Sequence, residues 1–208
     1  MKKKIRVDDG EVLPVMEIFY SLQGEGYHTG KAASFMRIGG CDVGCNWCDV
    51  KESWNASVHP VYSFRDIVSE ILKKPSDTVV LTGGEPFLYK LNKLTNLLKK
   101  NNYTIHVETS GTVKLSGHID WICLSPKKGH TPLPSFYKKA HELKIIIHNH
   151  DDFYWAEQNA QRANPLCKLY LQPEWSVKKD MIPLIIDYIK QNTKWTLSLQ
   201  THKYLNIP

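Results

Sequence analysis

Hydrophobic residues follow two alternating periods along the chain, one typical of strands and one typical of helices. Short runs rich in β-branched and aromatic residues predict strands at 12–19, 33–38, 78–81, 103–107, 119–124, 144–147, 168–171 and 195–199. Apolar residues spaced every three or four positions predict helices over 64–73, 89–100, 134–143, 151–163 and 177–191. This alternation favours an α/β fold whose parallel strands are joined by right-handed crossovers. Because the strand–helix units are too few for a closed barrel, we expect an incomplete (β/α) barrel of mostly parallel strands.

The composition is that of a soluble globular protein. Hydrophobic residues make up 42% and charged residues 23% of the 208 positions, which argues against disorder. We see no linker, so we expect one domain over residues 1–208. No apolar run is long enough to span a membrane, and Asp8, Asp9 and Glu11 follow the basic start before any apolar segment. We therefore expect a cytoplasmic protein without a secretory signal. The formal charge of +6 is mild and the lysines are scattered, so no direct nucleic-acid partner is expected.

The cysteines carry the first chemical signal. There are five, an odd number, which argues against a disulfide framework and for a reducing compartment. Cys41, Cys45 and Cys48 form a C-x3-C-x2-C loop directly after the predicted strand at 33–38. Thiolates are soft ligands that suit iron–sulfur clusters or zinc. Three thiolates on a cubane cluster leave one iron open to bind and activate a ligand, and we favour this interpretation.

Two other interpretations of these cysteines stay open. A structural zinc site needs a fourth ligand, but His59, Cys123 and Cys167 do not stand at zinc-finger spacing. A closed cluster in an electron carrier would take Cys123 or Cys167 as its fourth ligand. The remaining histidines share no spacing, and we expect them on the surface or in the core.

Several polar or glycine-rich segments follow predicted strands, where parallel sheets bind their ligands. They are Gly39-Gly40-Cys41, Thr82-Gly83-Gly84-Glu85-Pro86, Glu108-Thr109-Ser110-Gly111, Ser125-Pro126-Lys127 and Gln172-Pro173. Each is weak evidence alone, since Gly-Gly or Ser-Pro after a strand is usually a turn. Their shared position predicts one binding site at the carboxyl edge of the sheet.

The C-x3-C-x2-C loop resembles that of radical S-adenosylmethionine enzymes, and the whole chain resembles the 7-carboxy-7-deazaguanine synthases among them. The segments that carry this resemblance are 19–26, 35–37, 41–49, 82–86, 108–112, 125–127, 171–173 and 200–207. The resemblance implies conversion of 6-carboxy-5,6,7,8-tetrahydropterin to 7-carboxy-7-deazaguanine with loss of ammonia, a step of queuosine biosynthesis. It also implies an incomplete barrel of the radical S-adenosylmethionine type.

The same resemblance assigns residues to ligands. A 4Fe–4S cluster is expected on Cys41, Cys45 and Cys48. S-adenosylmethionine is expected on Trp47, Asp49, Gly83, Gly84, Glu85, Ser110, Ser125, Pro126, Lys127 and Gln172. The substrate is expected on Leu22, Gln23, Gly24, Glu25, Arg37, Thr82, His202 and Pro208. An arginine fork suits the substrate carboxylate, and an amide suits the donor and acceptor edge of a pterin. No side chain stands out as a catalytic acid or base.

One position departs from the family pattern. The family usually has Cys-Asp-Thr after the last cluster ligand, and that threonine hydroxyl ligates Mg²⁺, whereas this chain has Val50. Valine offers no side-chain oxygen to a hard cation. We therefore expect Mg²⁺ to bind through substrate and water, through Asp49 or Glu52, or to matter less here.

The resemblance further implies an electron donor such as flavodoxin or ferredoxin, a homodimer, and no membrane partner. A radical enzyme-activating protein of similar size is the nearest alternative, but it would not need 23–26 or 200–207. An RNA-binding module is another, although aromatic stacking motifs are lacking.

Overall fold

The computed structural model describes residues 11–208, so the basic start discussed above lies outside the described residues. Nine strands form one sheet in the order β3-β1-β2-β4-β5-β6-β7-β8-β9. Their bounds are β1 Val12–Leu22, β2 Ala32–Ile38, β3 Val61–Ser63, β4 Thr78–Gly83, β5 Thr104–Thr109, β6 Trp121–Leu124, β7 Glu142–Ile147, β8 Lys168–Pro173 and β9 Trp195–Leu197. The helices are α1 Phe64–Leu72, α2 Asn92–Lys100, α3 Pro134–Lys139, α4 Asp151–Ala160, α5 Lys178–Gln191 and α6 Thr201–Leu205.

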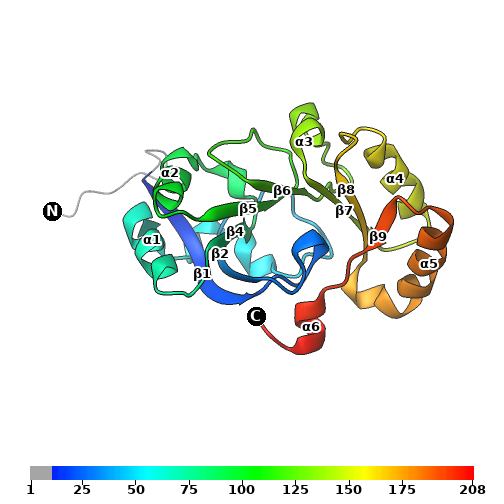
Figure 1. The fold of residues 1–208 in the computed structure, drawn as a ribbon, viewed down its shortest axis with the longest axis horizontal. Coiled ribbons are helices and arrows are strands. Elements are labelled where there is room, and N and C mark those ends of the chain that lie inside the picture. The colour runs from blue at the N-terminus through cyan, green and yellow to red at the C-terminus, as the bar shows by residue number, and fades with distance from the viewer. Residues whose placement is uncertain (1–10) are drawn as a thin grey trace.

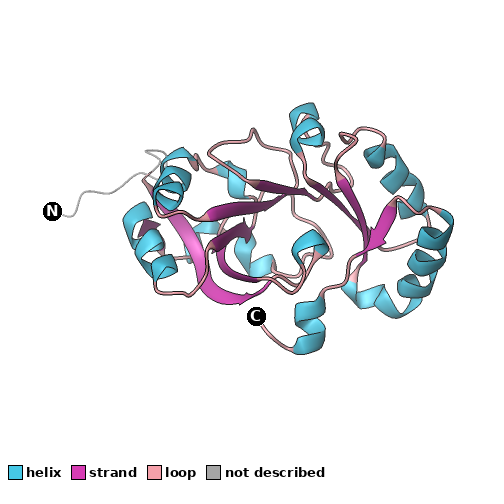
Figure 2. Ribbon diagram, in the orientation of Figure 1, coloured by secondary structure: helices cyan, strands magenta, loops and turns pink. Residues whose placement is uncertain are grey.

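The expected open, mostly parallel barrel is confirmed. Neighbouring strands from β2 through β4 to β9 pair in parallel, whereas β1 pairs antiparallel with both β2 and β3. Strands β3 and β9 stand at opposite ends of the strand order and do not pair, so the barrel stays open. Figures 1 and 2 show the strands forming one curved sheet, with α1 and α2 at one side and α4 and α5 at the other.

The two faces of the sheet differ in chemistry. One face packs against the helices through a single large apolar cluster that includes Leu81, Ile105, Leu124 and Ile145, each fully buried. The opposite face carries only a small apolar cluster, Ala33, Phe35 and Val80 with Phe19 beside it. Successive side chains of a strand point to opposite faces. Polar residues at the intervening positions therefore gather on the concave face.

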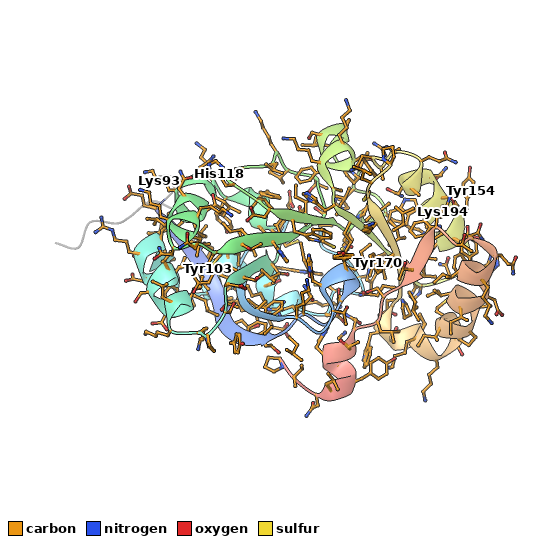
Figure 3. The ribbon with its side chains drawn as sticks, in the orientation of Figure 1. Lys93, Tyr103, His118, Tyr154, Tyr170 and Lys194 are labelled. Carbon is orange, nitrogen blue, oxygen red and sulfur yellow. The ribbon has the colours of Figure 1, made fainter. Side chains whose placement is uncertain are left out.

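Contacts between outer elements hold the helices in place. Ser63 caps α1, since its hydroxyl oxygen accepts from the Asp66 N–H at 3.2 Å. The hydroxyl of Tyr103, before β5, reaches the carbonyl of Ile71 in α1 at 3.4 Å. Figure 3 labels Tyr103 on this side of the molecule, and Tyr154 and Lys194 beside the outer helices at the far end.

Some sequence expectations were wrong in their limits. The helix expected over 134–143 ends at Lys139, because Asn164 captures the freed carbonyls of Tyr137 and Ala140 by its N–H (3.0 Å) and its side-chain amide (2.7 Å). The last two residues of the expected helix, Glu142 and Leu143, instead belong to β7 and pair with β8. Two short elements, β3 and α6, were not expected, since segments this short carry too little periodicity. Within residues 11–208, no helix is long and apolar enough to cross a membrane.

Candidate active site

A cavity of about 280 Å³ lies on the concave side of the sheet, at the carboxyl ends of its parallel strands. It brings together nearly every site residue expected from the sequence; only Pro126 is not among its lining residues. The lining residues of that set are Leu22, Gln23, Gly24, Glu25, Arg37, Cys41, Cys45, Trp47, Cys48, Asp49, Thr82, Gly83, Gly84, Glu85, Ser110, Ser125, Lys127, Gln172, His202 and Pro208. Segments nearly 190 residues apart in the chain thus share one site.

The cysteine loop packs directly against the Gly-Gly turn that ends β4. The N–H of Glu85 donates to the Gly40 carbonyl at 2.9 Å, and the N–H of Gly84 donates to the Ile38 carbonyl at 2.9 Å. A Cβ on Gly84 would lie 1.9 Å from the Gly40 oxygen, and Gly83 has φ +120. Both glycines are therefore required sterically, because this turn leaves no room for a side chain.

The three clustered thiols fit a cubane cluster better than a single ion. Cys41, Cys45 and Cys48 all line the cavity and are partly exposed. Across residues 11–208, no group of three His, Cys, Asp or Glu side chains converges closely enough to hold a single metal ion. In a cubane each thiolate binds a different iron, so the thiols need not converge on one point.

The other two cysteines stand apart from this cavity. Cys123 is buried in β6 with its Sγ 3.6 Å from Glu142, and Cys167 is also buried. Burial raises the pKa of the Cys123 thiol well above its ordinary value and that of Cys167 to about 12. A closed four-cysteine cluster would need one of them at the cavity, so the geometry disfavours that interpretation.

The carboxylate of Glu85 fixes two turns of the site. It accepts from the Thr109 hydroxyl at 2.7 Å, from the Ser110 hydroxyl at 2.6 Å and N–H at 2.9 Å, and from the Phe87 N–H at 3.2 Å. It is 1% exposed. With its oxygens already satisfied, this side chain positions the turns after β4 and β5, and the backbone there is left to face a ligand.

The far wall of the cavity combines an aromatic ring with polar groups. Trp47, inside the cysteine loop, stacks on His148 with ring centroids 6.2 Å apart. The Lys127 ammonium donates to the Ser125 hydroxyl at 2.6 Å, and burial lowers the pKa of Lys127. Gln172 is buried and accepts from Ser198 at 2.7 Å, which fixes its amide.

Arg37 and Thr82 form another wall, because they are paired neighbours on the parallel strands β2 and β4. The Arg37 Nε donates to Glu17 at 2.6 Å, and its guanidinium carbon lies 5.7 Å from the centre of the Phe19 ring. Phe19 stacks on Phe35 at 5.0 Å. Glu17 binds Arg37 through Nε, so the two terminal nitrogens of the guanidinium are left for a ligand.

The sequence analysis missed a buried charge network on this face. Lys144 on β7 forms ion pairs with Glu25 and, at 3.5 Å, with Glu108 of β5. Gln23 donates to Glu108 at 3.1 Å and Gln200 donates to Glu25 at 2.9 Å. The sequence did contain one indication of this network: Lys144 and Glu108 stand at inward-facing positions of strands that are otherwise apolar.

Charge pairing outweighs burial in this network. Burial alone would raise the pKa of Glu25, but the Lys144 ammonium and the Gln200 amide hold that pKa at about 2. Burial likewise opposes the charge of Lys144, yet the surrounding acidic groups raise its pKa well above the ordinary value. The pair is therefore ionised at neutral pH.

The C-terminal segment closes the cavity. The Thr201 N–H donates to the Gly24 carbonyl at 2.9 Å, and the Ser21 hydroxyl donates to the Pro208 carbonyl at 2.9 Å. A Cβ on Gly24 would lie 2.1 Å from Nδ1 of His202. In Figure 1, α6 lies below the sheet in this view, and the C-terminus lies near β1.

The cluster loop is tied to this same segment. The Lys203 ammonium is 2.7 Å from Oδ1 of Asp49, and Gln200 donates to Oδ2 at 2.8 Å. Both oxygens of Asp49 thus have partners, which disfavours Asp49 as a substitute Mg²⁺ ligand. Val50 lines the cavity, whereas Glu52 does not.

Comparisons with known proteins agree with this geometry. The family model "Radical SAM superfamily" matches residues 36–151. The 7-carboxy-7-deazaguanine synthase of Flavobacterium psychrophilum is 55% identical over 205 residues, which cover 99% of this chain and 97% of that protein. The enzyme of the same name from Synechocystis sp. is 45% identical over 194 residues, which cover 93% of each chain. The crystal structure of QueE from Escherichia coli has a TM-score of 0.81 and 30% identity, covering 94% of this chain and 98% of its own.

An open, mostly parallel barrel with three clustered cysteines at its carboxyl edge is the architecture of a radical S-adenosylmethionine enzyme. Such an enzyme uses a 4Fe–4S cluster and S-adenosylmethionine. Within this class, the chain belongs to the 7-carboxy-7-deazaguanine synthase family.

Proposed function

We propose that this enzyme converts 6-carboxy-5,6,7,8-tetrahydropterin to 7-carboxy-7-deazaguanine with loss of ammonia, in queuosine biosynthesis. The observation that carries the proposal is one cavity lined both by the three cysteines and by the residues expected to bind the pterin. The long identity to proteins named for this activity supports the same reaction.

The cofactors would bind at the cluster loop and the turns beside it. Cys41, Cys45 and Cys48 would hold the cluster, and the Gly83-Gly84 backbone would hold the amino group of S-adenosylmethionine. Ser110, Ser125 and Gln172 face the same space. When bound, the cluster and S-adenosylmethionine supply the hydrogen-atom abstraction that the reaction requires. The protein then has to orient the pterin and exclude water.

The substrate would bind at the part of the cavity lined by Arg37 and Glu108. The free guanidinium nitrogens of Arg37 suit the substrate carboxylate as a bidentate fork. The carboxylate of Glu108, whose side chain is 27% exposed and lines the cavity, suits the N–H donors of the aminopyrimidinone ring. His202 and Pro208 would close the pocket from the C-terminal side.

Five finer features belong to the same proposal. A single-electron donor such as a flavodoxin or ferredoxin would reduce the cluster. The protein would act as a homodimer in the cytoplasm, and residues 1–208 would form one domain. Mg²⁺ would bind weakly, held by substrate oxygens and water, because Val50 supplies no ligand.

The test is anaerobic reconstitution with iron and sulfide, followed by incubation with a chemical reductant, S-adenosylmethionine and 6-carboxytetrahydropterin. We expect 7-carboxy-7-deazaguanine and ammonia in equal amounts, measured by mass spectrometry and an ammonia assay. Cleavage of S-adenosylmethionine with the pterin left unchanged would contradict the proposal and favour a polypeptide substrate, as for an activating enzyme.

A further inference from the structure

A buried lysine with no assigned part in the reaction, Lys144, lines the cavity. The side chain of Lys144 is 4% exposed, and its ammonium contacts carboxylates from two distant segments, Glu25 and Glu108. Long cationic side chains are seldom buried unless they are paired. Here one cation pairs with two anions, so these three side chains together carry a net negative charge.

The two carboxylates differ in what else they contact. Glu25 is 13% exposed, accepts from Gln200, and is held within the protein. Glu108 is 27% exposed, accepts only one amide hydrogen, from Gln23, and keeps oxygen lone pairs toward the cavity. Both carboxylates line the cavity, but Glu25 is the more enclosed partner of Lys144 and Glu108 is the one more exposed to a ligand.

We propose that Lys144 is a positioning residue: its ammonium keeps Glu25 and Glu108 ionised side by side, so that Glu108 presents a pure hydrogen-bond acceptor to the N–H edge of the pterin. This inference rests on the proposed function, which by itself gives Lys144 no role. Without the cation, the two partly buried carboxylates would repel each other and one would take up a proton. A protonated carboxyl donates where the pterin also donates, and binding weakens.

Other titratable groups face Lys144, Glu25 and Glu108, and their charges also act on these three side chains. From the packed elements they are Cys123 on β6, Glu142 on β7, Lys127 after β6 and His202 on α6. Glu142 has partners of its own, the Trp121 Nε1 and the Tyr27 N–H, each at 3.2 Å. Glu142→Gln is therefore a matched control that removes a buried carboxylate on the same strand and face without removing a contact of Lys144.

The experiment measures binding of 6-carboxypterin, the oxidised and unreactive analogue of the substrate, to reconstituted enzyme with S-adenosylmethionine present. The dissociation constant is followed by pterin fluorescence at several pH values. The dissociation constant of each variant is divided by that of the native protein at the same pH, so that ionisation of the probe cancels. For Lys144→Met we expect binding weaker by roughly ten- to a hundredfold at pH 7, the loss of one hydrogen bond to a charged group. The deficit should shrink as pH rises, because higher pH ionises the second carboxylate.

The charge-balanced double variant Lys144→Met with Glu25→Gln is the decisive arm. It leaves Glu108 as the only ionised carboxylate of the two, so we expect it to bind the pterin at least about threefold more tightly than Lys144→Met at pH 7, with no pH dependence relative to native. Glu142→Gln should bind within about twofold of native. If the double variant binds as weakly as Lys144→Met, or fails to fold, the inference is wrong and Lys144 has a structural role. A pH-independent deficit in Lys144→Met also overturns it. Failure of the native protein to bind the pterin would instead refute the proposed function, and the inference with it.

Discussion

Strand β5 carries two kinds of residue on its two faces, and the contrast explains how this sheet combines stability with reactivity. Ile105 and Val107 point outward and are almost fully buried against the helices. Glu108, directly after Val107, points into the cavity, and His106, between Ile105 and Val107, lies on the same inner face. Strand β7 repeats the pattern, with Ile145 outward and Lys144 inward.

This difference separates two demands on the same backbone. Apolar side chains on the outer face stabilise the fold by leaving water, which requires only matching shapes. Charged side chains on the inner face are desolvated and remain only because they are paired, so each one constrains its neighbours. Substitutions on the outer face should therefore change stability, and substitutions on the inner face should change binding and chemistry.

The largest expected effect is loss of the cluster. Cys41→Ala, Cys45→Ala and Cys48→Ala should each bind little iron after anaerobic reconstitution and give no turnover, since each removes one of three ligands. Cys123→Ala, on the inner face but away from the cavity, should retain native iron content. Equal iron loss in Cys123→Ala would show that the cluster is closed by a fourth cysteine.

The next effect tests the outer face. Ile105 is fully buried, so Ile105→Ala should lower the free energy of unfolding by about 2–5 kcal/mol. Tyr154→Ala, at a position 71% exposed, should change it by no more than about 0.5 kcal/mol. Urea unfolding measures both. A loss of turnover per folded molecule in Ile105→Ala would contradict the inference that outer-face residues affect stability alone.

Arg37 tests the inner face. Arg37→Lys keeps the charge but loses the planar fork, so KM for the pterin should rise roughly ten- to a hundredfold. Cleavage of S-adenosylmethionine without substrate should survive. Glu17→Gln removes only a half-exposed ion-pair partner and should shift KM by less than about fivefold. An unchanged KM in Arg37→Lys would assign Arg37 a structural role.

His106 should make stability depend on pH. Burial and the neighbouring His28 lower the pKa of His106 to about 4, so the unfolded chain takes up a proton at higher pH than the folded one. The free energy of unfolding should fall between pH 6.5 and 4, by about 1–3 kcal/mol from this group. His106→Phe should flatten that fall in urea titrations at pH 7 and pH 4.5. An unaltered slope would mean that other groups, such as His28, dominate it.

The smallest expected effect is on the Mg²⁺ dependence of turnover, and it concerns Val50. We expect turnover in chelator-treated, Mg²⁺-free buffer and only a modest gain on adding Mg²⁺, because water and substrate must complete the shell. Val50→Thr should increase that gain, as followed by a Mg²⁺ titration of the initial rate. Complete Mg²⁺ dependence of the native enzyme, with tight saturation, would point to another oxygen ligand.

Local patterns sufficed for the regular strands and for motifs whose residues are contiguous. The C-x3-C-x2-C loop and the Gly-Gly turn needed no tertiary information, because their chemistry lies within a few residues. The Lys144 network did not emerge, since Glu25, Glu108 and Lys144 come from three separate segments. The end of α3 was also missed, because Asn164, more than twenty residues later, supplies the capping hydrogen bonds.

The most direct test of the account compares turnover in three proteins under identical anaerobic conditions: native, Cys48→Ala and Ile105→Ala. The quantity measured is 7-carboxy-7-deazaguanine formed from 6-carboxytetrahydropterin per folded molecule. We predict equal rates for native and Ile105→Ala at a temperature where both are folded, and no product from Cys48→Ala. Product from Cys48→Ala at the native rate, or none from the native protein with its cluster loaded, would contradict it.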